Sequence, residues 1–293
     1  MTEHHGNDAV ASRRRAPEPV PDRITLRADD GATAEIHRHG AHVTSWRPAP
    51  DGEERLFLSA ISAFGEGAAI RGGIPMIFPQ FAAEGPLPRH GFARTTTWSI
   101  GGVARSSNGM AEADFVLRDT DTTRAIWDAR FTAVVKVCVL SEQLAVTLDV
   151  ENVGDAPFSF TAALHTYLRV QDTSSVEIIG LRGTRYRVTG DDALLRDDDE
   201  RLRVRDYLDR VYVNAPPVLE LRDGAHTLTL ESEGFTDAVV WNPGAERAAA
   251  LTDLEPGGEK RFVCIEAAVV QTPVTIGPRR KWIGTQTLTA RAR

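Results

Sequence analysis

Apolar and polar residues alternate in short runs along nearly the whole chain. Runs such as RITLR, DFVLRD, RFTAVVKVCVL and LAVTLDV carry an apolar residue at about every second position, and Gly, Pro, Asn or Asp bounds them. This period-two pattern predicts half-buried β-strands joined by turns. Within VLELRDGAHTLTLES, the step Asp223-Gly224 predicts a tight hairpin, because these residue types tolerate the positive φ that such turns require.

Helical periodicity is weak throughout. The nearest approach is DDALLRDDDERLRVRDYL, whose acidic content predicts a surface loop instead. Many short strands without alternating helices predict an all-β fold, a large antiparallel β-sandwich. We expect residues 1–22 to form a disordered N-terminal tail, with no apolar core of a secretory signal, and residues 23–293 to form one β-sandwich domain.

Composition narrows the possible partners. The net charge of −7 over 293 residues argues against a broad nucleic-acid or anionic-membrane surface, and no apolar run is long enough to cross a membrane. Cys138 and Cys264 lie in apolar runs without metal-ligand spacing, which predicts buried thiols in a reducing compartment. We therefore expect a cytoplasmic protein, monomeric, whose partner is a small molecule.

One segment, 69–98, differs from the strands around it. Its sequence, AIRGGIPMIFPQFAAEGPLPRHGFARTTTW, is rich in Pro and Gly, which prevent a continuous strand, while its apolar residues predict order. Long ordered loops inside compact domains are usually functional. Arg71, Arg89 and Arg94 lie in it with His90, and a guanidinium suits phosphate or carboxylate. The alternative is that each arginine is a solvated surface charge.

Two titratable residues interrupt apolar strands. His165 lies in SFTAALHTYLRV and Glu266 in RFVCIEAAVV. Burying either group costs free energy unless it is paired or hydrogen-bonded. One structural alternative is that His165 is a core histidine whose polar atoms are hydrogen-bonded, and another is that Glu266 forms a buried salt bridge to an arginine. The functional alternative is that the two residues form an acid/base pair of different pKa. Asp209, near the start of the strand LDRVYV, is a weaker candidate that could equally be a turn residue.

Two other chemistries are disfavoured. His37, His39 and His42 in IHRHGAHV resemble a metal cluster, but carboxylates at ligand spacing are lacking and the turn at Gly40 separates His42, so we expect no metal site. Glycoside hydrolysis by two carboxylates would need a second buried acid beside Glu266, and no comparably apolar strand supplies one.

Six motifs together resemble one known family. GAHVTSWRP, IRGGIPMIFPQF, LPRHGFART, LHTYLRV, VVWNP and FVCIEAA occur in the order found in the hexose-6-phosphate mutarotases. These form the glucose-6-phosphate 1-epimerase branch of the aldose 1-epimerase (galactose mutarotase) superfamily. The resemblance runs from about residue 24 to KWIGTQTL and implies a β-sandwich that needs no cofactor.

The resemblance also implies roles for individual residues. His165 corresponds to the general acid and Glu266 to the general base, acting from opposite sides of the hemiacetal ring. Arg71 and Arg94 correspond to residues that bind phosphate and sugar, whereas His90 and Asp209 correspond to residues that line the sugar site. Arg89 departs from the family pattern, which has Gln there, and an extra cation could strengthen phosphate binding or change the preferred sugar phosphate.

Three other functions remain open at this point. A mutarotase for unphosphorylated aldoses would have little use for Arg71 and Arg94. A non-catalytic carbohydrate-binding module would not need a buried acid/base pair such as His165 and Glu266. A regulator that senses a sugar phosphate and contacts a partner through its N-terminal tail finds no specific support in that tail.

Overall fold

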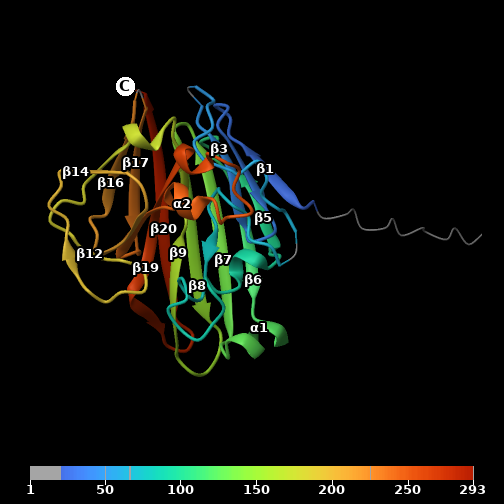
Figure 1. The fold of residues 1–293 in the computed structure, drawn as a ribbon. Coiled ribbons are helices and arrows are strands. Elements are labelled where there is room, and N and C mark those ends of the chain that lie inside the picture. The colour runs from blue at the N-terminus through green and yellow to red at the C-terminus, as the bar shows by residue number, and fades with distance from the viewer. Residues whose placement is uncertain (1–20, 50, 66, 225, 293) are drawn as a thin grey trace, which may run out of the picture.

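The protein is built from strands, with a few short helices between them (Figure 1). The computed structural model describes residues 21–49, 51–65, 67–224 and 226–292. Residues 1–20 of the predicted disordered tail lie outside these ranges. All pairings between the named strands are antiparallel, as predicted.

The strands form two large sheets and one small one. In spatial order, the nine-stranded sheet consists of β14 (Arg201–Arg203), β11 (Glu177–Ile179), β16 (Val218–Asp223), β17 (His226–Glu233), β20 (Lys281–Ala292), β8 (Gln143–Asn152), β7 (Phe131–Leu140), β6 (Ala111–Arg118) and β5 (Ser99–Arg105). The eight-stranded sheet consists of β13 (Leu195–Arg196), β12 (Arg185–Arg187), β15 (Leu208–Val213), β18 (Asp237–Asn242), β19 (Phe262–Ile276), β9 (Phe158–Leu164) and β4 (Met76–Ile77), with β10 (Tyr167–Arg169) also paired to β19. The small sheet consists of β1 (Arg23–Arg27), β2 (Thr33–His37) and β3 (His42–Arg47).

The large sheets pack face to face, which confirms the predicted β-sandwich. Val135 of β7 and Leu148 of β8 share one buried cluster with Leu164 of β9 and Ile265 of β19. Because successive side chains of a strand point to opposite faces, every second residue of β19 enters this core. The residues between them, including Glu266, therefore point to the outer face of the eight-stranded sheet.

That outer face is also covered, which explains why β19 reads as continuously apolar. Ile77 and Phe81 of the Pro- and Gly-rich segment pack on Val239 and Ala268 in one small cluster. Phe57 and Leu254 join residues of β10 and β19, among them Cys264, in a second cluster. The segment 69–98 is thus ordered, as predicted, and contributes only β4 and the 3₁₀ helix η1 (Ala93–Thr95) to the regular structure.

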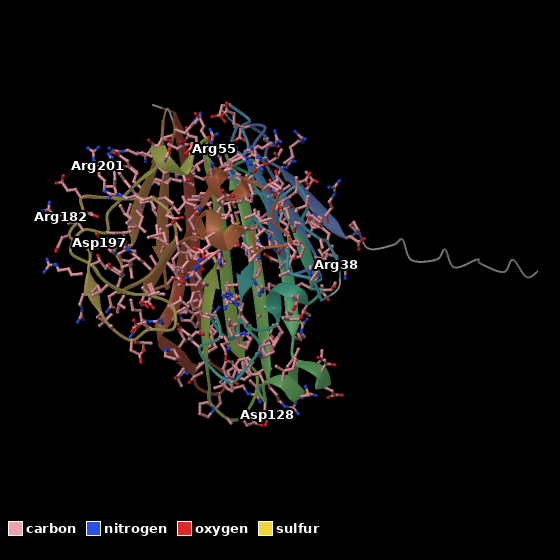
Figure 2. All side chains as sticks on the ribbon, in the orientation of Figure 1. Arg38, Arg55, Asp128, Arg182, Asp197 and Arg201 are labelled. Carbon is pink, nitrogen blue, oxygen red and sulfur yellow. The ribbon has the colours of Figure 1, made fainter. Side chains whose placement is uncertain are left out.

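Charged side chains lie mainly at the periphery. Figure 2 shows Arg182 and Arg201 pointing outward beside β14, and Asp128 at the end of the molecule near α1 (Asp121–Ile126). The remaining helices are α2 (Gly244–Ala248) and two 3₁₀ turns, η2 (Thr173–Ser175) and η3 (Gly258–Arg261). In the described ranges, none of the helices is long and apolar enough to cross a membrane.

Three local predictions need correction or refinement. Helices α1 and α2 have 6 and 5 residues, too few for a helical period to stand out in the sequence. The hairpin β16–β17 forms as predicted, but Asp223 ends β16 opposite His226, and it is Gly224 that has positive φ (56°). Cys264 is buried, whereas Cys138 is only half-buried, because its side of β7 carries half-exposed residues.

Candidate active site

His165 and Glu266 face each other across two neighbouring strands. Leu164 pairs with Ala267 and Tyr167 pairs with Cys264, so His165 falls opposite Glu266 on the outer face of the sheet. Nε2 of His165 lies 3.3 Å from Oε1 of Glu266. Strand register therefore brings together two residues that are far apart in the sequence.

The surroundings of this pair favour the neutral form of both groups. Burial raises the pKa of Glu266 well above its usual value, and the nearby negative charge of Asp209 raises it further. Burial lowers the pKa of His165, and the positive charges of Arg94 and Arg71 lower it further. Both shifts therefore act against an ion pair between an ionised Glu266 and a protonated His165.

Each member of the pair has one atom without a hydrogen-bond partner. These atoms, Oε2 of Glu266 and Nδ1 of His165, are buried, and among the described residues neither has a partner. Glu266 also has no arginine partner in that part of the chain, which rules out the expected alternative of a buried salt bridge to a guanidinium. Buried polar atoms without partners are costly, and they are common where a substrate completes the hydrogen bonding.

The expectation that the two groups flank the sugar from opposite sides does not fit this geometry. Since Glu266 and His165 are adjacent on one sheet face, they approach a ligand from the same side. This arrangement still suits ring opening, because the anomeric hydroxyl and the ring oxygen are bonded to the same carbon.

A cavity of about 290 Å³ opens above the pair. This volume is near the lower end for small-molecule sites. All seven residues singled out from the sequence line it: Arg71, Arg89, His90, Arg94, His165, Asp209 and Glu266. The structure therefore brings the predicted set together in one place.

Backbone geometry in the segment 69–98 positions the arginine at its start. Gly73 has φ +62°, and a Cβ there would lie 2.2 Å from the carbonyl oxygen of Val43, so only glycine fits. His42 Nε2 lies 2.7 Å from the carbonyl oxygen of Gly72, and His39 Nε2 lies 2.6 Å from that of Ala68. These two histidines of the IHRHGAHV motif therefore hold the segment on β3 and its preceding turn.

Arg71 is fixed in place by hydrogen bonds from three of its nitrogen atoms. Nε and Nη2 lie 3.2 and 3.1 Å from the two carboxylate oxygens of Asp253, and Nη1 donates to the hydroxyl of Tyr167 at 2.9 Å. These contacts fix the orientation of the guanidinium, and Asp253 balances its charge. Since a guanidinium has five N–H groups, some remain available to a ligand.

Arg94 is a less compensated cation. Its Nε is buried without a hydrogen-bond partner in the described chain, and Nη2 reaches only the carbonyl oxygen of Arg89, at 3.5 Å. Burial lowers the pKa of Arg94, and the positive charge of Arg71 lowers it further. With Arg89 exposed at the rim, this corner of the cavity carries an excess of positive charge.

His90 and Asp209 are both held in defined orientations. Nδ1 of His90 accepts the backbone N–H of Ala82 at 3.2 Å, so its proton is on Nε2, and burial together with Arg94 lowers its pKa to about 2. Asp209 accepts the hydroxyls of Thr189, at 2.6 Å, and Tyr207, at 2.8 Å. A neutral N–H donor and a fixed carboxylate acceptor suit the hydroxyls of a sugar.

Four contributing residues were not identified from the sequence. The ring of Tyr167 stacks on His165 with centroids 4.9 Å apart, and Trp241 meets His165 edge-on at 5.7 Å. Both lie in motifs already quoted, so their position beside the candidate residues was a usable signal. Thr189 and Asp253 lie in polar loops, and nothing in the local sequence distinguishes them from surface residues.

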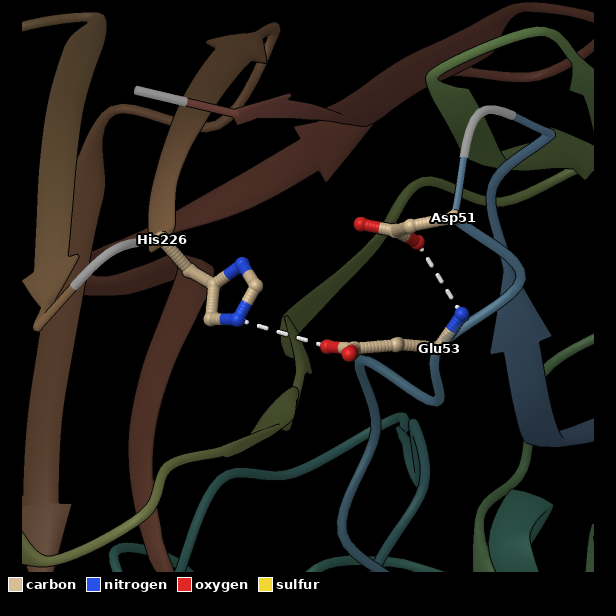
Figure 3. Close-up of side chains that lie close together, drawn as sticks. All are labelled: Asp51, Glu53 and His226. Carbon is tan, nitrogen blue, oxygen red and sulfur yellow. Dashed lines mark hydrogen bonds and ion pairs between the residues drawn. The ribbon is translucent and has the colours of Figure 1, made fainter.

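A separate cluster could suggest a metal site. Within the described ranges, Asp51, Glu53 and His226 form the one group of three potential ligands (Figure 3). Arg55 contacts both carboxylates, with Nη1 3.0 Å from Glu53 Oε2, and His226 contacts Glu53. Because both carboxylates already pair with Arg55, we assign no metal to this cluster.

Comparison with known proteins fits this fold and this cavity. The chain belongs to the aldose 1-epimerase family, whose model matches residues 22–289. A relative from Cenchrus ciliaris is 35% identical over 92% of this chain and 84% of its own length, and one from Escherichia coli is 35% identical over 78% and 77%. Both carry the name "Putative glucose-6-phosphate 1-epimerase". The crystal structure of a "putative mutarotase (YeaD)" from Salmonella typhimurium superposes with a TM-score of 0.84 at 29% identity, covering 92% of this chain and 90% of the other.

Proposed function

We propose that this protein interconverts the α and β anomers of a hexose 6-phosphate, with glucose 6-phosphate as the first candidate. The observation that carries the proposal is the buried pair His165–Glu266 at the floor of a cavity whose rim holds Arg71, Arg89 and Arg94. The names of the relatives from Cenchrus ciliaris and Escherichia coli support the same substrate.

The proposed reaction needs one base and one acid. Glu266, as carboxylate, removes the proton of the anomeric hydroxyl; the C1–O1 bond becomes a carbonyl, the bond from C1 to the ring oxygen breaks, and protonated His165 gives its proton to that oxygen. Rotation about C1–C2 and closure by the reverse steps give the other anomer. The protein ends with the same protons it began with.

The other cavity residues would bind the substrate. The positive charge of Arg94 and Arg89 attracts the phosphate dianion, and Arg71 adds directed hydrogen bonds from a guanidinium fixed by Asp253. Asp209 and His90 are placed to hydrogen-bond sugar hydroxyls. Tyr167 and Trp241 provide an aromatic wall beside His165.

Two-dimensional NMR exchange spectroscopy on a panel of free and 6-phosphorylated aldoses tests the proposal. We expect the folded protein to increase the α/β exchange rate of glucose 6-phosphate, and to increase that of free glucose by a smaller factor. A folded protein that accelerates no hexose 6-phosphate would refute the proposal. Faster exchange of the free sugar would instead favour a mutarotase for unphosphorylated aldoses.

A further inference from the structure

The acid/base pair lies in an electric field set by the cavity. Arg71, Arg89 and Arg94 line the same cavity as His165, and their positive charges act on its imidazole, whereas the negative charge of Asp209 acts on Glu266. Arg71 is connected to His165 through one residue: its Nη1 donates to Tyr167, whose ring stacks on the imidazole. A positive charge on His165 is thus opposed by the same residues that would bind a phosphate.

This field favours the wrong protonation state for ring opening. Ring opening by the proposed roles needs an ionised Glu266 and a protonated His165. In the free protein, burial and the neighbouring charges work against that state, because they raise the pKa of Glu266 and lower that of His165. The charged and titratable groups around the imidazole are Glu266 and Cys264 of β19, Tyr167 of β10, Asp209 of β15, Asp253 after α2, and Arg71, Arg89, His90 and Arg94 of the segment 69–98.

We propose that the phosphate of the substrate switches the pair into its reactive form: the dianion neutralises the arginine corner of the cavity, and a proton moves from Glu266 Oε1 to His165 Nε2 along their 3.3 Å contact. One O–H bond breaks and one N–H bond forms, with no change in total charge. The inference rests on the proposed function and adds to it: the phosphate raises the rate of the chemical step as well as the affinity. Each pKa unit that His165 regains raises the population of the reactive pair about tenfold.

Phosphite dianion added to free glucose tests the switch, because it supplies the charge without the covalent link. We expect phosphite to raise glucose turnover at least tenfold in the wild type. Arg94→Gln should abolish this activation, and Arg182→Gln, a matched change on the exposed surface, should preserve it. Phosphite that competes with glucose 6-phosphate without activating glucose overturns the inference, and so does phosphite that neither competes nor activates.

Nitrogen-15 NMR of the histidine rings gives an independent readout. We expect His165, assigned by its loss in His165→Asn, to be neutral in the free protein and protonated on both nitrogens when phosphite is bound. A ring that stays neutral with phosphite bound overturns the switch. The two proposals fail separately. If the protein does not accelerate anomer exchange of glucose 6-phosphate, the proposed function is refuted. If it does, but phosphite does not activate the turnover of free glucose, only the switch is refuted.

Discussion

Among the described residues, two histidine–carboxylate contacts of equal length lie in very different settings. Nε2 of His165 lies 3.3 Å from Glu266, and Nε2 of His226 lies 3.3 Å from Glu53 (Figure 3). The side chain of Glu266 is 1% exposed, whereas that of Glu53 is 58% exposed. Contact geometry alone therefore does not distinguish a reactive pair from a surface pair.

The difference lies in burial and in the remaining partners. Glu53 also binds Arg55, and its side chain is exposed to water. Within the described residues, His165 is the one ion-pair partner of Glu266, and one oxygen of Glu266 has no hydrogen-bond partner. A desolvated pair beside a cavity can transfer protons to a ligand, and a solvated pair cannot do so selectively.

The largest effect is expected from removing either member of the buried pair. Glu266→Gln keeps the shape but removes the base, and His165→Asn removes the acid. Each should lower kcat for glucose 6-phosphate about 10²- to 10⁴-fold, the usual contribution of general acid–base catalysis. Steady-state kinetics with Glu53→Gln as the matched control should give turnover close to wild type. Near-normal turnover in either buried variant would show that its assigned role is wrong.

The next largest effect concerns the partly buried arginines, Arg71 and Arg94. A charge-assisted contact contributes about 1.5–3 kcal/mol, so Arg94→Ala or Arg71→Ala should lower kcat/KM for glucose 6-phosphate about ten- to a hundredfold. Turnover of free glucose should not fall and, by the proposed switch, should rise, because the removed charge no longer opposes a protonated His165; a side-by-side measurement would detect the difference. Because Arg71→Ala leaves Asp253 unpaired in the cavity wall, adding Asp253→Asn should restore part of the loss. Equal losses for both sugars would mean that the arginines contact the ring or serve only the fold.

The stability of the protein in acid should depend on two buried histidines, His42 and His90. The pKa values of His42 and His90 are lowered to about 3 and about 2, mainly by burial. Below the ordinary value of 6.5 the unfolded chain binds protons there that the native protein does not, so stability is full above that pH and falls as the pH falls. Each histidine should contribute a slope approaching about 1.4 kcal/mol per pH unit.

The His165–Glu266 pair should be silent in this experiment. The raised pKa of Glu266 contributes stability that is lost as the pH rises, and the lowered pKa of His165 contributes stability that is lost as the pH falls, so the two contributions oppose each other. Urea unfolding at several pH values between the ordinary pKa values of the two groups, 4.5 and 6.5, should therefore show a steeper acid slope in Glu266→Gln and an unchanged slope in Glu53→Gln. An unchanged slope in both variants would contradict the opposed pKa shifts of the pair.

The smallest effect is expected at Arg89, the exposed cation of the rim. Salt and water screen an exposed charge. Arg89→Gln should therefore weaken the binding of glucose 6-phosphate less than tenfold, and the effect should be smaller at high salt than at low salt. The kinetic constants at two ionic strengths provide the check. A loss as large as that of Arg94→Ala would mean that Arg89 moves onto the bound phosphate.

The sequence was sufficient for the β-sandwich and for seven of the residues that line the cavity. Alternation gave the strands, and the odd residues within apolar strands, Glu266 and His165, were visible because burial makes such residues costly. Their adjacency on one side of the ligand depends on the register between β9, β10 and β19, which local patterns do not encode. The same limit hid Asp253, which gains its role only because the fold brings its loop to Arg71.

Two local features depend on the whole fold for a related reason. We did not expect His39 and His42 to bind a metal, and their contacts to the backbone carbonyls of Ala68 and Gly72 come from tertiary packing. Cys138 was expected to be buried because its strand is apolar, yet which face of β7 meets the core decides its exposure. The alternation and composition of a segment predict that it forms a strand, whereas the whole fold decides what packs against each face of that strand.

The most direct test of the central claim is exchange spectroscopy of glucose 6-phosphate with three proteins at equal concentration: wild type, Glu266→Gln and Glu53→Gln. The buried pair predicts strong α/β exchange cross-peaks with the wild type and with Glu53→Gln, and exchange reduced at least a hundredfold with folded Glu266→Gln. Equal acceleration by all three proteins would contradict the assignment of Glu266 as the base, and no acceleration by the wild type would contradict the proposed activity itself.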